Sequence, residues 1–200
     1  MAKMTLLKGA AFAVALAFSS GSAMAAETYY TDQGHTEVRF GWSHVGVSMQ
    51  SGEFTKVDGM LVLDPDDVSK SKLSVTIDAN SLSTGYQPLD AHLRSTDFLD
   101  VEGSPQITFE STEVRKTGDT TADVTGDLTI RGVTRPVTLK TTLTHRGDHP
   151  MGAYFPHYRG KWTAFSATAQ IDHQAFKVGN FSTGPITIWI STEMKDRKDG

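Results

Sequence analysis

The stretch Leu73-Ser74-Val75-Thr76-Ile77-Asp78-Ala79 alternates apolar and polar residues without a break. Successive side chains of a β-strand point to opposite faces, so this pattern predicts a strand with one apolar and one polar face. Leu73, Val75 and Ile77 share the apolar face. Because such a strand buries only one side, we expect the fold to supply one apolar interior against which that side packs.

The same alternation recurs on both sides of this stretch. Further strands are expected at 37–48, 54–63, 106–111, 122–130, 137–143, 163–171 and 185–191. They are joined mostly by short turns, and strands do not alternate with helices. About eight strands joined in this way predict an all-β, antiparallel sheet, and a sheet of that length hides its edges best by closing into a barrel.

The interior of an eight-stranded barrel is either filled by side chains or holds one small ligand. A strand of ten residues is ~33 Å long, and a tilt of about 40° leaves roughly 25 Å along the barrel axis. A space of this shape is long and narrow, so it suits a linear lipid better than a flat disc. From the residues alone, a filled core and a ligand tunnel both stay open.

One stretch, Thr84–Pro105, breaks the alternation. Leu89 and Leu93 are four residues apart and therefore share a face on a helix. A second short apolar run begins at Phe98, and a glycine and a proline end the stretch. This pattern predicts a short helical segment with an apolar underside, which either plugs the core or covers the mouth of a cavity.

The inward faces of the predicted strands and the underside of the helical segment are apolar. The residues predicted to line the interior are Phe40, Trp42, Val62, Leu73, Val75, Ile77, Leu89, Leu93, Phe98, Ile107, Phe109, Leu128, Ile130, Leu139, Phe165 and Ile188. This set contains no pair of carboxylates and no histidine. Such an interior binds apolar matter by burial, at about 25 cal/mol per Å², and lacks the groups that acid–base catalysis requires.

A family resemblance is carried by residues of the helical stretch. Asp90, His92, Leu93, Arg94, Ser95, Asp97, Phe98 and Asp100 resemble the D-x-H-L-R-S-x-D-F-x-D signature of the YceI family, which comprises bacterial periplasmic lipocalin-like proteins that bind polyisoprenoids. The segments 35–46 and 126–137 resemble two further motifs of that family. The resemblance implies an eight-stranded lipocalin-like barrel with a short helical segment covering one end. It also implies that the predicted lining residues bind a polyisoprenoid, either a prenyl phosphate or an isoprenoid quinone.

Residues 1–25 are typical of a cleavable signal peptide. A basic start precedes an apolar run at 10–18, which is too short to span a bilayer, and small residues at 23–25 fit a cleavage site. We therefore expect export to the periplasm, a mature chain that begins at Ala26, and one β-barrel domain over 26–200.

Charge and cysteine content exclude several classes of protein. Removing Lys3 and Lys8 with the leader changes the net charge from −4 to −6, and a mildly acidic domain is a poor binder of nucleic acid. The chain has no cysteine, so disulfides, thiol catalysis, cysteine zinc sites and a lipoprotein anchor are not expected. We expect a soluble product without stable membrane insertion, whose hydrophobic core provides the stability.

Histidines and charged residues are the remaining candidates for chemistry. Three histidines share one predicted loop, namely His145, His149 and His157. The first two have the spacing of a helical metal pair, but nearby glycines and a proline disfavour a helix, so we expect no metal and no cofactor. His35, His44 and His92 occupy signature positions. They either converge near the barrel mouth, where they would bind a polar head group, or have a structural role.

The polar residues of the helical stretch have two interpretations. Asp90, Arg94 and Asp97 are expected to form ion pairs and turn caps that hold the helical cover onto the barrel; a catalytic acid–base cluster is the alternative. The chain departs from the family pattern near 172–179, because His173 and Lys177 stand where arginine and glycine are usual. We expect this change to affect loop closure or the ligand head group.

The function implied by the resemblance is binding rather than catalysis. The protein is expected to sequester or carry a polyisoprenoid lipid, with no nucleic-acid partner. Two alternatives remain, a lipid-modifying enzyme and a stress-related structural module with a filled barrel. No catalytic constellation is visible in the sequence, which disfavours the enzyme. Members of the family often form dimers, so a homodimer also stays open.

Overall fold

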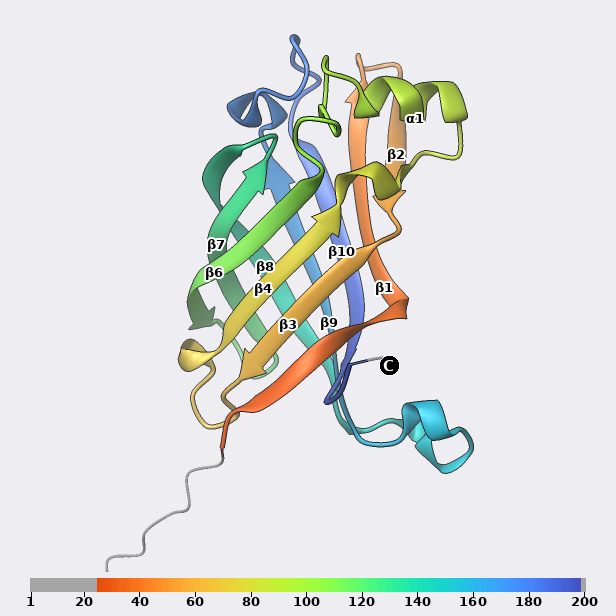
Figure 1. The fold of residues 1–200 in the computed structure, drawn as a ribbon. Helices are drawn as coiled ribbons and strands as arrows, with labels where there is room; N and C mark the ends of the chain where they lie inside the picture. The colour runs from red at the N-terminus through yellow and green to blue at the C-terminus, as the bar shows by residue number, and fades with distance from the viewer. Residues whose placement is uncertain (1–24, 199–200) are drawn as a thin grey trace, which may run out of the picture.

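The computed structural model of the chain describes residues 25–198, which form one ten-stranded antiparallel sheet that closes on itself (Figure 1). The strands are β1 (Glu27–His44), β2 (Ser48–Phe54), β3 (Val57–Leu63), β4 (Lys72–Asp78), β5 (Leu82–Ser83), β6 (Gln106–Lys116), β7 (Thr121–Ile130), β8 (Val133–Asp148), β9 (Lys161–Ile171) and β10 (Ile186–Lys195). The helices are α1 (Gln87–Arg94) and the 3-10 turns η1 (Val68–Lys70), η2 (Ala79–Ser81), η3 (Pro150–Ala153), η4 (Pro156–Tyr158) and η5 (His173–Phe176).

Eight of the strands make the wall of the barrel. Their order is β10-β9-β8-β7-β6-β4-β3-β1, and β1 pairs with β10 to close the ring. The two remaining strands extend the sheet at one end only, where β2 pairs with the second half of β1, and β5 pairs with β2. The expected eight-stranded antiparallel barrel with one short helix at an end is therefore confirmed.

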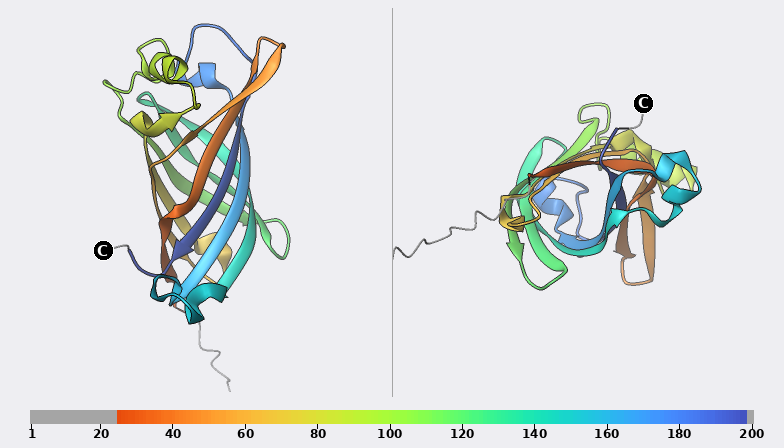
Figure 2. Two further views of the ribbon diagram at one scale, coloured as in Figure 1. Left: turned by 90° about the vertical axis from the view of Figure 1, so that its right-hand side faces the viewer. Right: turned by 90° about the horizontal axis from the view of Figure 1, so that it is seen from below.

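The two ends of the barrel differ. At one end, called here the helical end, lie α1, η5 and the turn between β1 and β2 (Figures 1 and 2). The opposite end carries η1, the turn between β6 and β7, and the segment with η3 and η4 (Figure 2). None of the helices in the described part of the chain has the length and apolarity needed to cross a bilayer.

The β1–β2 hairpin differs from the sequence prediction. A strand was expected to continue over 37–48 through a bend, but β1 ends at His44 and β2 begins at Ser48, antiparallel to it. Val45 and Gly46 form the turn at φ values of 47° and 81°. The prediction is wrong in this half because left-handed backbone is strained for a β-branched residue, so valine is not a turn signal.

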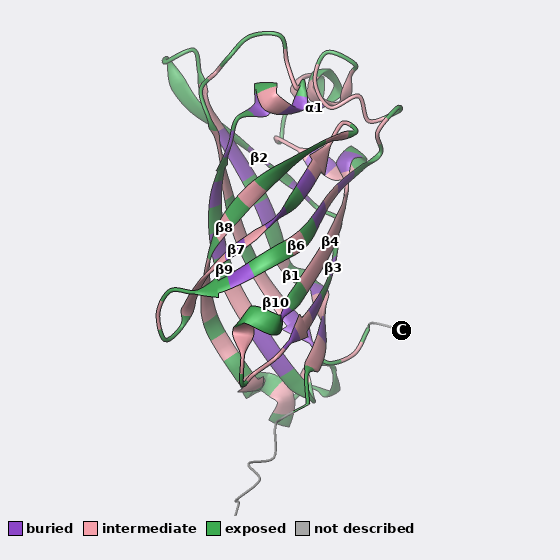
Figure 3. Cartoon of the chain, turned by 90° about the vertical axis from the view of Figure 1, so that its left-hand side faces the viewer, coloured by how far each residue is buried: buried purple, intermediate pink, exposed green. Residues whose placement is uncertain are grey.

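The hydrophobic core follows the alternation along the strands, and buried and exposed segments succeed one another in Figure 3. One large cluster of buried side chains occupies most of the barrel, and it includes Phe40, Phe54 and Phe109. A smaller cluster around Tyr29 and Met194 lies where β1 meets β3 and β10. The period-two sequence pattern thus produces one apolar interior inside the closed wall.

Candidate functional site

The interior of the barrel contains two adjoining cavities. The one toward the opposite end has a volume of about 430 Å³, and the one toward the helical end has a volume of about 530 Å³. Five residues line both cavities, namely Phe54, Ile107, Ile130, Ile171 and Ile188. Because they share these residues, the two cavities lie next to each other inside the barrel, one toward each end.

The structure brings nearly all of the predicted lining residues together. The cavity toward the opposite end is lined by Leu73, Val75, Ile77, Ile107, Phe109, Leu128, Ile130, Leu139, Phe165 and Ile188. The cavity toward the helical end is lined by Phe40, Trp42, Leu89, Leu93 and Phe98, together with Ile107, Ile130 and Ile188. Their positions on the cavity walls agree with the prediction, and their contact with a bound molecule stays a prediction.

Val62 is the exception, and its predicted inward position is wrong. Its neighbours Leu61 and Leu63 are buried and line the cavity, so the alternation of β3 turns Val62 to the outer face. Because all three residues are apolar, alternation alone does not choose between the two registers. The pairing with β4 decides it: Leu61 lies opposite the inward-facing Leu73, and directly paired residues share a face.

Sequence reasoning missed several residues of the cavity wall. Phe54 and Ile171 line both cavities but were not predicted to do so. Ile171 follows Phe165 on the same face of β9, as do the small buried residues Ala167 and Ala169. The alternation along the predicted strand 163–171 therefore indicated that Ile171 faces the interior. Phe54 ends β2, a strand that the sequence prediction did not separate from β3.

Helix α1 covers the cavity with its apolar side, as Leu89 and Leu93 both line it. Its polar side is fixed to the preceding loop. Asp90 Oδ1 accepts hydrogen bonds from the Thr84 amide at 2.7 Å and from Thr84 Oγ1 at 2.6 Å. The hydrogen bond from the Thr84 hydroxyl is the main reason that the pKa of Asp90 lies below its usual range. Arg94 Nε donates to the carbonyl oxygen of Asn80 at 3.1 Å. The expected turn-capping role is seen for Asp90. Arg94 holds α1 through main-chain carbonyl oxygens rather than through an ion pair, and Asp97 lies 3.8 Å from His92 Nε2.

A second tie holds the loop that contains η5. Arg131, at the turn between β7 and β8, donates from Nη1 to the carbonyl oxygens of Phe98 at 3.0 Å and Lys177 at 2.7 Å. The buried His173 places Nδ1 2.5 Å from the carbonyl oxygen of Val178, so this nitrogen carries the proton. These contacts connect the loop after α1 with the loop that contains η5, and the two loops together cover the mouth of the cavity.

Polar groups occur at the ends of the apolar space. His44, His92, His173 and Thr183 are on the wall of the cavity at the helical end. The predicted convergence of signature histidines is therefore correct for His44 and His92. For the third, His35, the structural alternative holds, because it lies outside that wall with Nδ1 2.5 Å from Asp32 Oδ2.

The segment with η3 and η4 is held by a group of ionisable residues. The Asp32 side chain is only 3% exposed, and its Oδ1 lies 3.2 Å from Lys195 Nζ and 3.3 Å from His157 Nε2. Burial raises the pKa of a carboxyl group, but hydrogen bonds from His35 and Lys195 outweigh it and hold the pKa of Asp32 below its usual range. These histidines and this carboxylate therefore fix the segment to the barrel wall.

The three loop histidines do not form a metal centre. His149 stacks on Tyr158, with ring centroids 4.2 Å apart, and its Nε2 lies 3.4 Å from Glu193 Oε2. His145 lies 6.5 Å from His149 between ring centroids. Within residues 25–198, no group of three or more histidine, aspartate or glutamate side chains is placed to hold a metal ion.

Comparison with known proteins places this barrel among relatives. The family model described as a YceI-like domain matches residues 29–195. Protein YceI of Salmonella agona is 42% identical to this chain over 173 residues, which cover 86% of this chain and 86% of that protein.

Two solved structures share the same architecture. The YceI protein of Campylobacter jejuni has a TM-score of 0.67 at 26% sequence identity and covers 76% of this chain and 88% of its own. A polyisoprenoid binding domain from Saccharophagus degradans, implicated in plant cell wall breakdown, has a TM-score of 0.60 and covers 85% of this chain and 98% of its own. Since the second is 11% identical in sequence, that likeness shows the fold alone.

Proposed function

We propose that this chain, which belongs to the YceI-like domain family, is a periplasmic binding protein that holds a polyisoprenoid lipid in the apolar space of its barrel. The observation that carries the proposal is the pair of adjacent apolar cavities inside the barrel. They share Phe54, Ile107 and Ile188 as lining residues, and each cavity alone falls within the range of typical ligand sites.

The shape of the space favours a linear ligand. The two cavities follow one another along the barrel and share Ile130 and Ile171 as lining residues, so a chain that extends along the barrel suits them better than a broad ring system. A polyisoprenoid tail is linear and apolar, so its burial is favourable by about 25 cal/mol per Å². The polyisoprenoid binding domain of Saccharophagus degradans has the same fold, and the choice of ligand here follows that parallel together with the apolar cavities of this chain.

The ends of the space provide for a polar head group. The imidazoles of His44 and His92 and the hydroxyl of Thr183 line the cavity at the helical end, and such groups donate or accept hydrogen bonds. A prenyl phosphate and an isoprenoid quinone both have oxygen atoms that accept them. The expected periplasmic location rests on the leader predicted at 1–25, which lies outside the described residues except for Ala25.

Binding without chemical change is supported by the composition of the walls. Among the described residues that line the two cavities, Asp119 is the one carboxylate, and it lines a different cavity from the histidines His44, His92 and His173. Acid–base work on a lipid generally uses a pair of titratable groups with different pKa values that face the same bond. The cavity walls therefore support storage or transport of the ligand.

The experiment that tests this function is native mass spectrometry of protein purified without detergent, followed by lipid extraction. We expect an isoprenoid to co-purify with the wild type. Ile77→Trp fills part of the cavity and should lower lipid occupancy while the melting temperature of the lipid-free protein stays similar or rises. Thr76→Trp, on the same strand but outside both cavities, is the matched control and should keep the wild-type lipid content.

In a filled core, Ile77→Trp would instead overpack the interior and reduce stability by ~1–3 kcal/mol. Absence of lipid in the wild type, combined with that loss of stability, would contradict the proposed function.

A further inference from the structure

Exposed apolar side chains surround the mouth of the cavity at the helical end. They come from three separate segments, which are the β1–β2 hairpin, the loop before α1 and the loop between η5 and β10 (Figures 1 and 2). The exposed fractions are 67% for Val45, 80% for Val47, 68% for Met49, 65% for Tyr86 and 52% for Phe181. These five residues are called the collar below. Since Val45 and Phe181 also line the cavity, the collar continues the apolar interior out to the surface.

Apart from the exposed Lys177, which directly follows η5, the segments that carry the collar have no formal charge. Residues 40–52, 79–89 and 178–192 contain no aspartate, glutamate, lysine or arginine, although these types make up 21% of the chain. The exposed Asp97 lies beyond these segments, after α1. An uncharged surface of this kind matches the neutral interior of a bilayer, where a charged side chain is expensive.

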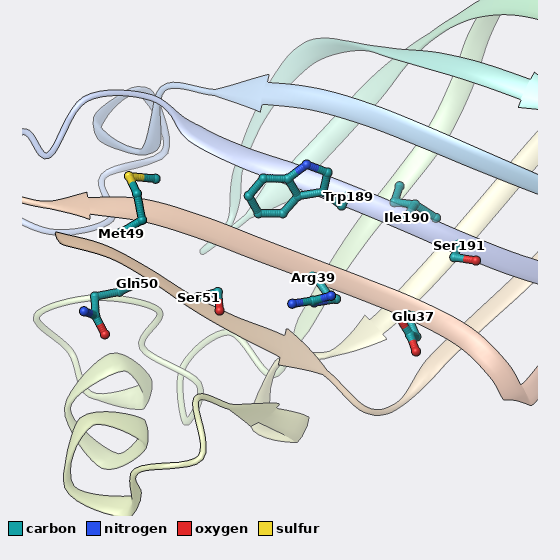
Figure 4. A pocket seen from close by; sticks show the side chains of 8 residues that line it. All are labelled: Glu37, Arg39, Met49, Gln50, Ser51, Trp189, Ile190 and Ser191. Carbon is teal, nitrogen blue, oxygen red and sulfur yellow. The ribbon is translucent and has the colours of Figure 1, made fainter.

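The outer wall below the collar shows an ordered change in polarity (Figure 4). Met49 lies nearest the hairpin tip. Trp189 pairs directly with the charged Arg39, and its indole ring reaches toward Gly41 on the tip side of that pair, whereas Glu37 lies farther down the wall. Apolar tips, then an indole ring, then charges is the order of residues at a membrane–water interface, where tryptophan sits at the level of the head groups. Gly41 allows the indole to lie on the sheet, because a Cβ there would be 2.7 Å from Trp189 Cζ3.

The hairpin tip keeps an apolar residue in a conformation that disfavours it. Val45 has a φ of 47°, which is strained for a β-branched residue. Asparagine adopts this conformation readily and is the ordinary choice for such a turn. A strained, exposed valine at the rim of a cavity indicates that the apolar surface at this position is functional.

We propose that the collar docks on a lipid bilayer and places the mouth of the cavity against the hydrocarbon region. This proposal rests on the proposed function, since an apolar ligand must pass between the bilayer and the cavity. The collar consists of protruding tips around an opening rather than one flat face. Fluid lipid fits around such tips, whereas a folded partner needs a complementary, continuous surface.

The test is co-sedimentation of the purified protein with vesicles of the zwitterionic lipid phosphatidylcholine. We expect the wild type to pellet with the vesicles and Val47→Asp to lower the partition coefficient by about tenfold or more, in line with the unfavourable transfer of a charge into a bilayer. The matched controls carry the same change at the opposite end, at residues that are also exposed, Tyr154→Asp and Phe155→Asp. Both should pellet like the wild type.

A second variant separates docking from folding. Val45→Asn relieves the strained turn, so it should raise the melting temperature and still weaken vesicle binding. Docking is refuted if the wild type stays in the supernatant or if the opposite-end controls lose binding as strongly as Val47→Asp. If Val47→Asp converts a dimer into a monomer without loss of vesicle binding, the collar contacts a second copy of this chain. That outcome also refutes docking on a bilayer.

The lipid content of each preparation, measured by mass spectrometry, distinguishes this inference from the proposed function. Lipid-loaded wild type that does not bind vesicles leaves the binding function standing and refutes docking. Wild type that binds vesicles through the collar but never contains lipid refutes the binding function and supports docking.

Discussion

Arg131 and Lys177, 46 residues apart in sequence, are joined by a hydrogen bond of 2.7 Å from the guanidinium Nη1 to the main-chain carbonyl oxygen. Both residues have left-handed backbone, with φ values of 51° and 58°. The same Nη1 also donates to the carbonyl oxygen of Phe98 at 3.0 Å. One side chain therefore ties two covering loops to the barrel wall.

We expect Arg131→Ala to loosen the cover without unfolding the barrel. Loss of the two hydrogen bonds should lower the free energy of unfolding by about 1–3 kcal/mol, since hydrogen bonds to charged groups fall in that range. Hydrogen exchange should quicken at the amides of residues 97–101 and 176–181. The control is Arg135→Ala, because Arg135 bonds only the adjacent carbonyl of Thr134. Equal rates of hydrogen exchange in Arg131→Ala and Arg135→Ala would contradict the conclusion that Arg131 holds the two loops.

Lys177→Gly is expected to stabilise the protein. Left-handed backbone costs a non-glycine residue roughly 1–2 kcal/mol, and part of this gain is lost to the greater freedom of glycine in the unfolded chain. A net gain of about 0.5–1 kcal/mol should raise the melting temperature by ~1–4 °C in thermal unfolding. Lys177→Ala retains the strain and should show no such gain. A lower melting temperature for Lys177→Gly would rule out strain at this position.

Asp32→Asn is expected to be strongly destabilising. Both partners of the Asp32–Lys195 ion pair are buried, with side chains 3% and 1% exposed, and breaking a buried pair typically costs about 3–5 kcal/mol. Chemical denaturation is the appropriate measurement. The control is Lys56→Met, which removes an exposed ion pair with Asp78 and should change stability by less than about 1 kcal/mol. A loss this small for Asp32→Asn would refute the prediction.

Glu27 should make stability depend on acid pH. A hydrogen bond from Tyr29 at 2.7 Å, with support from Arg146 and Lys161, lowers the pKa of Glu27 from 4.5 to about 2. Because the folded state binds its proton less readily than the unfolded state, this stabilisation is complete above about pH 4.5. It is lost as the pH falls toward 2, and it amounts to at most ~3 kcal/mol.

Glu27→Gln should therefore flatten the dependence of the unfolding free energy on pH between about 4.5 and 2. Glu53→Gln, on an exposed position of β2, provides the control and should leave the wild-type slope. An unchanged slope in Glu27→Gln would show that this carboxylate does not carry the effect.

The barrel and most of its lining were predictable because alternation survives in the strands. Ile77, Phe109 and Leu128 face the cavity as their sequence parity indicates. The prediction was wrong at Val62, where three consecutive apolar residues carry no parity signal and strand pairing decides the face. A local sequence pattern therefore determines the direction of a side chain only where the two faces of its strand differ in polarity.

Other features depend on partners that are distant in sequence. The first half of β1 has no apolar alternation around the buried Asp32, and its partner Lys195 lies 163 residues away. For His35, a place at the mouth and a structural role both stayed open from the sequence, and its contact with Asp32 decides for the structural role. No local pattern indicated the Asp32–Lys195 contact, since it exists only once the two ends of the described chain meet.

The seam between β1 and β10 has a consequence for the order of folding. It pairs the first and last described strands, with Phe40 opposite Ile188. Synthesis proceeds from the N-terminus, so β1 must wait for nearly the whole chain before it finds this partner. Contacts of such long sequence separation form slowly, and until they form the edge of β1 exposes unpaired amides and carbonyls to other chains. Closure of the ring is thus a post-synthetic event, and the period before it is when the chain is most prone to aggregate.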